Sequence, residues 1–383
     1  MNSELSFKIV ETRITSVETF VVAYPVTGHF KFFVTRDGKA PVRSTVVIKI
    51  TDDHGNIGWG QSVPSPTWSY ETIESVRTTI DRHLGLALVG LNPFDEPAIE
   101  AMLKGTIADS FSTGQPICKA GIDLALFDLT GRILNQSAAK RWSRKCEGSI
   151  TLSWTIDTRS VEEVGELVSL ATERGFHHFN IKVTGDAGFD VELCREIRRL
   201  APDAFAWVDA NCGYDVETAK VVAPKMAELN IAALEQPFPA NRLSWFRELR
   251  QQGALPVLMD EPIVSVVDLE EFHRLGLLDG VAMKLSRCGG LTEARRILEF
   301  MEENGLLFFA SGLTDPDLSL AASLSLYSAF GLKRPAALNG PQFLSETILT
   351  NPIAIAGDQA TVPIGFGLGV EVDLGRMAEL SID

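Results

Sequence analysis

Apolar and polar positions follow a regular repeat in the second part of the chain. Short apolar runs recur about once every 25 residues, and each is followed by a stretch whose apolar residues recur at three and four positions, as in a helix. Strand, helix and strand at this spacing predict parallel strands joined by right-handed crossovers. Eight such units close a TIM barrel. The predicted strands are 150–154, 179–183, 205–210, 231–237, 255–262, 280–285, 306–311 and 336–341.

The chain before these repeats has a different pattern, which predicts an α+β unit. Residues 14–26 and 43–61 have the composition of strands, and a turn signal at 53–55 divides the second stretch into two strands. Residues 71–84 and 118–134 carry apolar side chains at helical spacing. We therefore expect three strands and at least two helices here.

The Gly-rich tail at 356–373 is again strand-like, and we expect it to return to the α+β unit. No low-complexity linker separates the parts of the chain. The predicted division is an α+β domain of residues 1–130 with 350–383 and a barrel domain of residues 131–349.

Composition excludes several classes of partner. The chain has 383 residues, of which 45% are hydrophobic, so it can form a large core. Its formal net charge of −15 provides no basic surface for nucleic acid or an anionic membrane. The 5 cysteines show no CxxC spacing, which favours free thiols over a disulfide framework or a zinc site. With no signal-peptide pattern and no long apolar span, we expect a cytoplasmic protein.

Charged residues interrupt consecutive predicted strands near their carboxyl ends. They are separated by 27, 26, 25 and 24 residues, so each lies one repeat after the last. Equivalent strand ends of a closed barrel converge on one face, where active sites of this fold are built. Each residue alone has an ordinary explanation, such as a solvated lysine or an aspartate that caps a turn or helix. Together they favour a site, formed by Lys182, Asp209, Glu235, Asp260 and Lys284.

Three of these residues are carboxylates, which repel one another at low dielectric unless a cation lies between them. Oxygen ligands from Asp209, Glu235 and Asp260 suit a hard ion that keeps positions open for water and substrate. We therefore expect Mg²⁺, with Mn²⁺ as the alternative. Lys182 and Lys284 lie on the second and sixth predicted strands, so we expect their amines to face each other across the barrel mouth.

This combination predicts proton transfer next to a substrate carboxylate. A divalent ion stabilises the charge that develops when the α-proton leaves and an enediolate forms. A lysine is a competent base only if its pKa is lowered, which we expect from the cation and from partial burial. Two facing lysines could invert a stereocentre, or one could protonate an enolate formed by ring opening or elimination. A racemase, a cycloisomerase and a hydroxy-acid dehydratase of the sugar-acid or hydroxyproline type are therefore alternatives, and a non-catalytic binding barrel is a remote one.

At these positions the chain resembles the enolase superfamily, specifically the mandelate racemase and muconate lactonizing enzyme group. The stretches "VDAN", "LEQP", "MDEP" and "MKLSRCGGL" are similar to the group's successive strand motifs, and "DDHGNIGWGQ" is similar to the hairpin of its capping domain. The resemblance covers nearly the whole chain. It implies a modified (β/α)7β TIM barrel with an α+β capping domain formed by the N-terminal region and the C-terminal tail. It implies the same Mg²⁺ ligands and the same two acid/base lysines.

Because no histidine follows His273, the chain is more similar to the muconate cycloisomerase-like branch, in which both bases are lysines. That branch usually carries Lys-x-Lys where this chain has Asn180, Ile181 and Lys182. The neutral amide of Asn180 leaves the pKa of Lys182 and the charge pattern of the substrate open.

The resemblance also implies a small-molecule carboxylate substrate and a homo-oligomer. It assigns specificity to the barrel loops and to the capping loop at 26–39, whose aromatic residues suggest an apolar substrate body with an anionic head. Residues expected to support the metal ligands or to contact substrate are Asn180, Asn211, Glu261, Asp315, Phe30 and Phe32.

Overall fold

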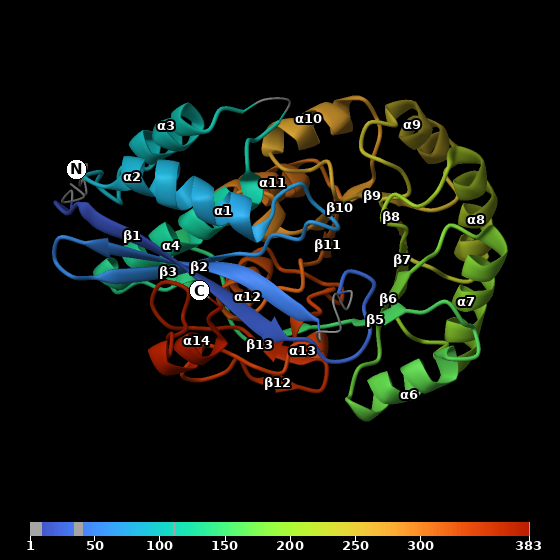
Figure 1. Ribbon diagram of the computed structural model, residues 1–383. Coiled ribbons are helices and arrows are strands. Elements are labelled where there is room, and N and C mark those ends of the chain that lie inside the picture. The colour runs from blue at the N-terminus through green and yellow to red at the C-terminus, as the bar shows by residue number, and fades with distance from the viewer. Residues whose placement is uncertain (1–9, 34–40, 110–111, 383) are drawn as a thin grey trace, which may run out of the picture.

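The structure, a computed structural model, describes residues 10–33, 41–109 and 112–382. Residues 34–39 of the predicted capping loop therefore lie outside the described residues. An antiparallel sheet of three strands and a parallel sheet of seven strands dominate the fold (Figure 1). The parallel sheet curls around an axis with helices on its outside, as the spacing of the apolar runs predicts (Figure 1).

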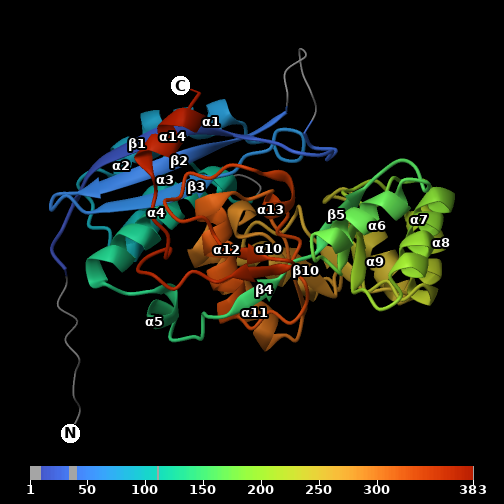
Figure 2. The same cartoon turned by 90° about the horizontal axis from the view of Figure 1, so that it is seen from below.

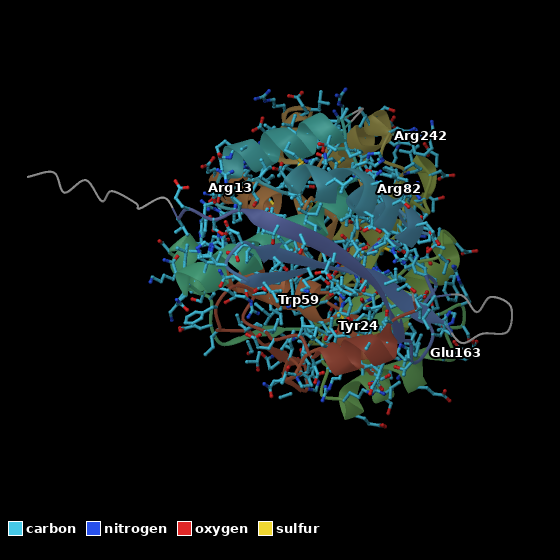
Figure 3. All side chains as sticks on the ribbon, turned by 60° about the vertical axis from the view of Figure 1, so that its left-hand side comes forward. Arg13, Tyr24, Trp59, Arg82, Glu163 and Arg242 are labelled. Atoms are coloured by element: carbon cyan, nitrogen blue, oxygen red, sulfur yellow. The ribbon has the colours of Figure 1, made fainter. Side chains whose placement is uncertain are left out.

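The antiparallel sheet has the order β1 (Ile14–Pro25), β2 (Val42–Asp52) and β3 (Ile57–Ser62). The turn between β2 and β3 closes on Asp52, whose carboxylate accepts hydrogen bonds from the backbone N–H groups of His54 (3.0 Å) and Asn56 (2.7 Å). Tyr24 and Trp59 lie on this sheet (Figure 3), are buried, and belong to the same hydrophobic cluster as the barrel strands. Sheet and barrel therefore share one core.

Helix α4 (Pro116–Leu134) packs unusually close to β3 because two glycines remove the side chains between them. A Cβ atom added to Gly60 would lie 2.0 Å from the carbonyl oxygen of Gly121, and one added to Gly58 would lie 2.2 Å from that of Ala125. Any larger residue would push the helix off the sheet.

Shorter helices lie beside the sheet and enclose a second apolar cluster with β1, β2 and α4. The predicted helix at 71–84 is present, but its second half is a π-helix. Thr72 and Ser75 form a capping box at its start. The elements are α1 (Ile73–Thr79), η1 (Ile80–Leu84), α2 (Gly85–Leu88) and α3 (Glu96–Thr106).

The barrel strands follow one another in chain order around the parallel sheet. They are β5 (Trp154–Asp157), β6 (Phe179–Lys182), β7 (Ala206–Asp209), β8 (Leu234–Glu235), β9 (Val257–Met259), β10 (Gly280–Met283) and β11 (Leu307–Ala310). The outer helices are α6 (Val164–Glu173), α7 (Ala187–Leu200), α8 (Val216–Glu228), α9 (Leu243–Gln252), α10 (Val266–Arg274), α11 (Leu291–Glu303) and α12 (Asp317–Ala329).

The first and last predicted barrel strands need correction. The run at 150–154 was expected to be the first barrel strand, but β4 (Ser149–Thr151) pairs instead with the C-terminal tail, and the barrel begins at Trp154. The run at 336–341 forms no strand. Its Ala336 and Ala337 make single parallel bridges to Leu152 and Ser311, at the two edges of the seven-stranded sheet. These bridges close the barrel, and the modified TIM-barrel fold is confirmed.

The tail contacts both parts of the molecule. Strands β12 (Ile355–Ala356) and β13 (Gln359–Thr361) extend β4 into a small antiparallel sheet. Helix α14 (Leu374–Leu380) lies beside β1 (Figure 2). After this helix, the backbone N–H of Ile382 donates to the carbonyl of Val21 at 3.0 Å. None of the helices within the described part of the chain has the length and apolarity that crossing a membrane requires.

Candidate active site

Charged residues from five strand ends meet at the carboxyl end of the barrel. Lys182, Asp209 and Glu235 are the last residues of β6, β7 and β8, and they are neighbours in the register of the sheet. Asp260 and Lys284 directly follow β9 and β10. All five are buried, none with more than 7% of its surface exposed. The barrel repeat thus brings chain-distant charges into one cluster.

The three carboxylates form a site that fits a divalent cation. Each of Asp209, Glu235 and Asp260 offers an oxygen, and these oxygens all lie within 4.8 Å of one another. Trp207 donates from Nε1 to Glu235 Oε2 at 2.8 Å, while Glu235 Oε1 is buried with no partner in the described part of the chain. Burial and the charge of Asp209 raise the pKa of Glu235 to about 8. Oxygen-only donors with one unpartnered buried atom are suited to a hard divalent ion.

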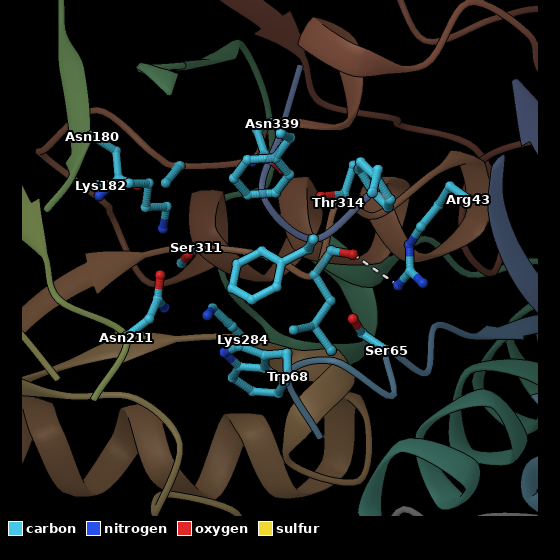
Figure 4. A pocket seen from close by; sticks show the side chains of 16 residues that line it. Arg43, Ser65, Trp68, Asn180, Lys182, Asn211, Lys284, Ser311, Thr314 and Asn339 are labelled. Carbon is cyan, nitrogen blue, oxygen red and sulfur yellow. Dashed lines mark hydrogen bonds between the residues drawn. The ribbon is translucent and has the colours of Figure 1, made fainter. Parts of the chain in front are cut away.

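Each lysine forms an ion pair with one carboxylate of this triad. Lys182 Nζ lies 2.5 Å from Asp209 Oδ2, and Lys284 Nζ pairs with Asp260 Oδ2. Burial alone would raise the pKa of Asp209, but the charge of Lys182, with smaller contributions from other lysines, lowers it instead. Figure 4 shows the Lys182 and Lys284 amines pointing into the same space from different strands.

The pKa of Lys284 without a cation among the carboxylates lies above its ordinary value, whereas the lowered pKa predicted from the sequence depends on a bound cation. Burial of Lys284 lowers its pKa, but the negative charge of Asp260 and of the other carboxylates around it outweighs burial and raises the pKa to about 12. The Lys284 amine also lies 4.6 Å from the centre of the Trp68 ring, a cation–π contact. A cation among the carboxylates would offset the charge that holds the proton on Lys284.

Arg287 is part of this cluster, although sequence reasoning missed it. Its Nη1 pairs with Asp260 Oδ1, and its Nε donates to the carbonyl of Ile263 at 2.7 Å. Asp260 therefore lies between Lys284 and Arg287. Lys284 and Arg287 are three residues apart in the sequence, and the 3₁₀ turn η2 (Leu285–Arg287) brings residues at this spacing to the same side of the chain. This spacing is the feature from which Arg287 could have been predicted.

A pocket lies over the two lysines and is lined by residues of both sheets and their loops. Its unfilled volume is about 30 Å³, room for about one or two water molecules. Phe30 and Phe32 form part of its wall, and their rings meet edge to face at 5.2 Å. Phe30 also stacks on Phe343 at 4.9 Å, so it packs between the N-terminal segment and the barrel as well as facing the pocket.

The predicted asparagines also line the pocket and retain unused hydrogen-bonding capacity. Both polar atoms of the Asn180 side chain are buried and have no hydrogen-bond partner among the residues that the structure describes. Asn211 donates from its backbone N–H and its Nδ2 to Asp209 at 2.8 and 3.0 Å, which leaves its Oδ1 free. Asn339, which was not predicted, likewise has a free Oδ1. Buried polar atoms without partners are rare in proteins and here mark a binding surface.

The other two predicted residues, Glu261 and Asp315, take part in the charge and hydrogen-bond network around the site. Glu261 follows Asp260, and burial together with the Asp260 charge raises its pKa. Asp315 accepts hydrogen bonds from Ser286 Oγ at 2.9 Å and from the backbone N–H of Leu313 at 3.2 Å. Neither residue lines the pocket itself.

Backbone strain gathers at the same end of the barrel. Positive φ angles are unfavourable for residues other than glycine and persist where the surrounding structure holds them, often at functional sites. Several occur in the segments that connect barrel strands to the helices after them, at Asn211 (42°), Cys212 (65°), Gln236 (37°), Thr314 (56°) and, as the first residue of α12, Asp317 (35°).

Comparison with known proteins gives consistent results. The N-terminal domain of mandelate racemase and muconate lactonizing enzyme matches residues 16–140, and an enolase C-terminal domain-like family matches residues 163–376. Chloromuconate cycloisomerase of Cupriavidus necator is 28% identical over 366 residues, which cover 94% of this chain and 97% of that protein. N-succinyl-L-Arg/Lys racemase of Bacillus cereus is 26% identical over 381 residues, covering 97% and 98%.

Among solved structures, 2-chloromuconate cycloisomerase from Rhodococcus opacus 1CP superposes with a TM-score of 0.87 at 23% identity, over 97% of this chain and all of that one (100%). It has the same fold. The chain is thus similar to a cycloisomerase and to a racemase at nearly equal identity, so the two reactions are distinguished by the residues of its own site.

Proposed function

The chain belongs to the mandelate racemase and muconate lactonizing enzyme group of the enolase superfamily, and we propose that it is a divalent-metal-dependent isomerase of a carboxylate substrate, of the cycloisomerase or racemase type. One observation carries the proposal. Two buried amines, those of Lys182 and Lys284, enter one pocket beside three buried carboxylates. This combination suits removal and return of a proton next to a substrate carboxylate.

Asp209, Glu235 and Asp260 would hold the metal ion, and their oxygen-only donor set favours Mg²⁺, with Mn²⁺ as the alternative. When bound, the ion supplies Lewis-acid stabilisation of the negative charge that develops on the substrate carboxylate. Asn211 orients Asp209 through two hydrogen bonds, and Arg287 orients Asp260.

Lys182 and Lys284 would move the proton. Their amines come from β6 and from the end of β10, so a substrate carbon between them presents one face to each (Figure 4). Loss of the α-proton to one amine and return from the other inverts the carbon, as a racemase requires. Delivery of a proton by one amine to an enolate formed by ring opening is the corresponding step of a cycloisomerase.

One feature favours a second candidate, a hydroxy-acid dehydratase that uses the same lysines. Asn180, two residues before Lys182, presents a neutral amide whose two polar atoms form no hydrogen bond with the described residues. A neutral amide can hold a substrate hydroxyl as donor and acceptor, whereas a lysine at this position would add a second cation.

Proton exchange distinguishes these candidates. The protein is incubated with Mg²⁺ in D₂O and a panel of carboxylic acids, and α-deuterium incorporation and product mass are recorded by NMR and mass spectrometry. Deuterium uptake with inversion indicates a racemase, a ring-closed isomer that carries one solvent deuterium indicates a cycloisomerase, and loss of water indicates a dehydratase.

The roles of the lysines are tested on any substrate found in this way. We expect Lys182→Ala and Lys284→Ala each to lower turnover by about 10²–10⁴-fold. Lys225→Ala, an exposed lysine of α8, is the matched control and should leave turnover unchanged. Full exchange in either pocket variant would contradict the two-lysine proposal. In a racemase, each variant should lose exchange from one enantiomer only.

A further inference from the structure

A second cavity lies at the other end of the barrel from the lysines and the carboxylates. Its unfilled volume is about 160 Å³, compared with about 30 Å³ for the pocket beside the lysines. Leu306, which directly precedes β11, lines this cavity, whereas Ser311, which directly follows β11, lines the pocket. The two spaces therefore lie at opposite ends of β11. The cavity is formed by the end of α11, the start of β11 and the segment that follows α12, and α11 packs against both of the other elements.

Most of the cavity wall is apolar. Leu298, Met301 and Phe330 are buried, and Leu306 and Phe308 are half-buried. A cavity of about 150 Å³ that is lined by leucine, isoleucine and phenylalanine side chains is large enough to hold benzene. At about 160 Å³, this cavity has room for one aromatic ring.

The acidic side chain at the cavity is already compensated by a cation. Glu302 is the only acidic residue among the described residues that line the cavity. Arg144 donates from Nη1 to Glu302 Oε1 at 3.1 Å and from Nη2 to Oε2 at 2.8 Å. The Arg144 guanidinium also lies 4.0 Å from the centre of the Phe330 ring, which holds it in place. This bidentate pair neutralises Glu302, so Glu302 does not balance the other cations of the cavity.

Those other cations, Lys333 and Arg334, form no ion pair with any carboxylate in the part of the chain that the structure describes. Lys333 is exposed at the rim, and Arg334 is half-buried. Arg334 makes only weak contacts, because its Nη1 lies 3.5 Å from the carbonyl oxygen of Phe308 and its guanidinium lies 5.0 Å from the centre of the Phe309 ring. Most of its five N–H groups are therefore available to an acceptor.

We propose that this cavity is a second ligand site, which binds a small carboxylate that carries a single aromatic ring. The ring packs against Phe308 and Phe330, and the carboxylate accepts from Arg334 and, at the rim, from Lys333. The ligand enters from the side of Gly331 and Lys333, which are both exposed. The inference goes beyond the proposed function and does not depend on it, because the cavity and the pocket beside the lysines share none of their described lining residues.

A packing defect is the alternative explanation of the cavity. An apolar cavity without a ligand-binding role admits a neutral ring as readily as a charged one, because only its volume and its apolar wall matter. A site for an aromatic carboxylate uses both the apolar wall and the cations. The two explanations therefore differ in what they predict for ligands that carry only the ring or only the charge.

The test measures binding to the full chain by fluorine NMR, with para-fluorobenzoate as the probe. EDTA is present, so that no metal at the barrel mouth attracts the probe. Three competitors are compared: benzoate carries ring and charge, benzyl alcohol carries the ring alone, and acetate carries the charge alone. We expect benzoate to displace the probe at concentrations about ten-fold lower than either of the others, because it gains both ring burial and a charge-assisted hydrogen bond. Absence of saturable probe binding, or equal displacement by benzyl alcohol, would overturn the proposal.

Substitutions of the two cations test their role in holding the carboxylate. Arg334→Gln removes the charge and keeps an amide donor, and it should weaken probe binding about ten-fold. Lys333→Gln, at the exposed rim, should weaken it by about three-fold, because solvent screens this charge. Lys225→Gln, at an exposed position of α8, is the matched control and should leave binding unchanged. Unchanged binding in Arg334→Gln would overturn the proposal.

A substitution that fills the cavity tests whether the ring binds there. Leu306→Trp keeps both cations but occupies the space, so it should abolish binding of the probe. A melting curve shows whether this variant is folded. If it is not, Leu306→Phe is used in its place, with a smaller loss of affinity expected. Full probe binding in the folded variant would contradict the location of the site.

Lys182→Ala distinguishes this cavity from the pocket beside the lysines. It alters only that pocket, so probe binding in EDTA should stay unchanged. Loss of binding in Lys182→Ala, together with normal binding in Arg334→Gln, would place the probe beside the lysines and overturn this inference.

Discussion

Buried carboxylates occur in two parts of this molecule, and their surroundings differ. At the junction of the antiparallel sheet with α4, Asp128 accepts from the backbone N–H groups of Trp59 and Leu368, each at 2.9 Å, and from Arg132 Nε at 2.8 Å. At the barrel mouth, Glu235 and Glu261 each keep one buried oxygen that accepts no hydrogen bond from any residue within 10–33, 41–109 and 112–382. The asparagines around them also keep unpartnered atoms.

This difference distinguishes buried carboxylates that stabilise the fold from buried carboxylates that are placed to bind a ligand. A buried polar group whose hydrogen bonds are complete stabilises the fold, and removing it leaves its partners unsatisfied. A buried group with unused capacity costs stability unless a ligand completes its contacts. The junction around Asp128 is therefore a structural site, whereas the mouth around Glu235 is built for a ligand.

The largest change in stability is expected from a substitution at Asp128. Asp128→Ala should lower the free energy of unfolding by about 3 kcal/mol, because two backbone donors and Arg132 lose a buried partner. Glu235→Gln should change it by less than about 1 kcal/mol, since the amide oxygen can still accept from Trp207 and a crowded carboxylate is removed. Urea denaturation without added metal measures both. A larger loss in Glu235→Gln would contradict the assignment of the two sites.

Added Mg²⁺ should stabilise the protein through the carboxylates at the barrel mouth and not through the site around Asp128. A divalent ion that binds only the folded protein stabilises it by about 2.7 kcal/mol at 100 times its dissociation constant. We expect Mg²⁺ to raise the melting temperature of the wild type and of Asp128→Ala, and EDTA to remove the gain. Glu235→Gln should show little or no gain. The same gain in that variant would mean that Mg²⁺ binds elsewhere.

A smaller effect on stability is expected at a buried carboxylate whose two oxygens both accept hydrogen bonds. These bonds do not fully offset the cost of burying its negative charge. Glu71 accepts from the backbone N–H groups of Ile117 and Cys118, each at 2.8 Å, yet burial raises its pKa to about 7 from an ordinary 4.5. The pKa of Glu71 is therefore higher in the folded protein than in the unfolded protein. Glu71 contributes its full stabilisation below pH 4.5, and this stabilisation is lost as the pH rises through 7.

The wild type should therefore lose about 2 kcal/mol between pH 5 and pH 7 relative to Glu71→Gln, which does not titrate. Chemical denaturation of both proteins across this range measures the difference. Parallel pH profiles would show that Glu71 titrates normally and that its hydrogen bonds at the start of α4 offset its burial.

Much of the site was predictable because a barrel has strict geometry. Once the strand repeat is recognised, the residues that end successive strands must converge, and this places Lys182, Asp209, Glu235, Asp260 and Lys284 together without any knowledge of their contacts. The roles assigned to these five residues stay a prediction until the variants are measured, as does the homo-oligomer.

Other features were not predictable from local pattern. The run at 150–154 has the composition of a barrel strand, but the partner of its first residues is the distant tail at 359–361, which no local pattern specifies. The π-helix at 80–84 has the same apolar spacing as an α-helix.

Sequence therefore determined the fold class and the members of the carboxylate and lysine cluster, because periodicity alone settles which residues share a face. Tertiary structure decided how each charge is compensated. Arg287 pairs with Asp260, whereas Arg43 donates to backbone carbonyls. The carboxylates around Lys284 raise its pKa as long as no cation lies among them. These outcomes depend on distances of a few ångströms between elements far apart in the chain, over which electrostatic energies in a low-dielectric interior change steeply.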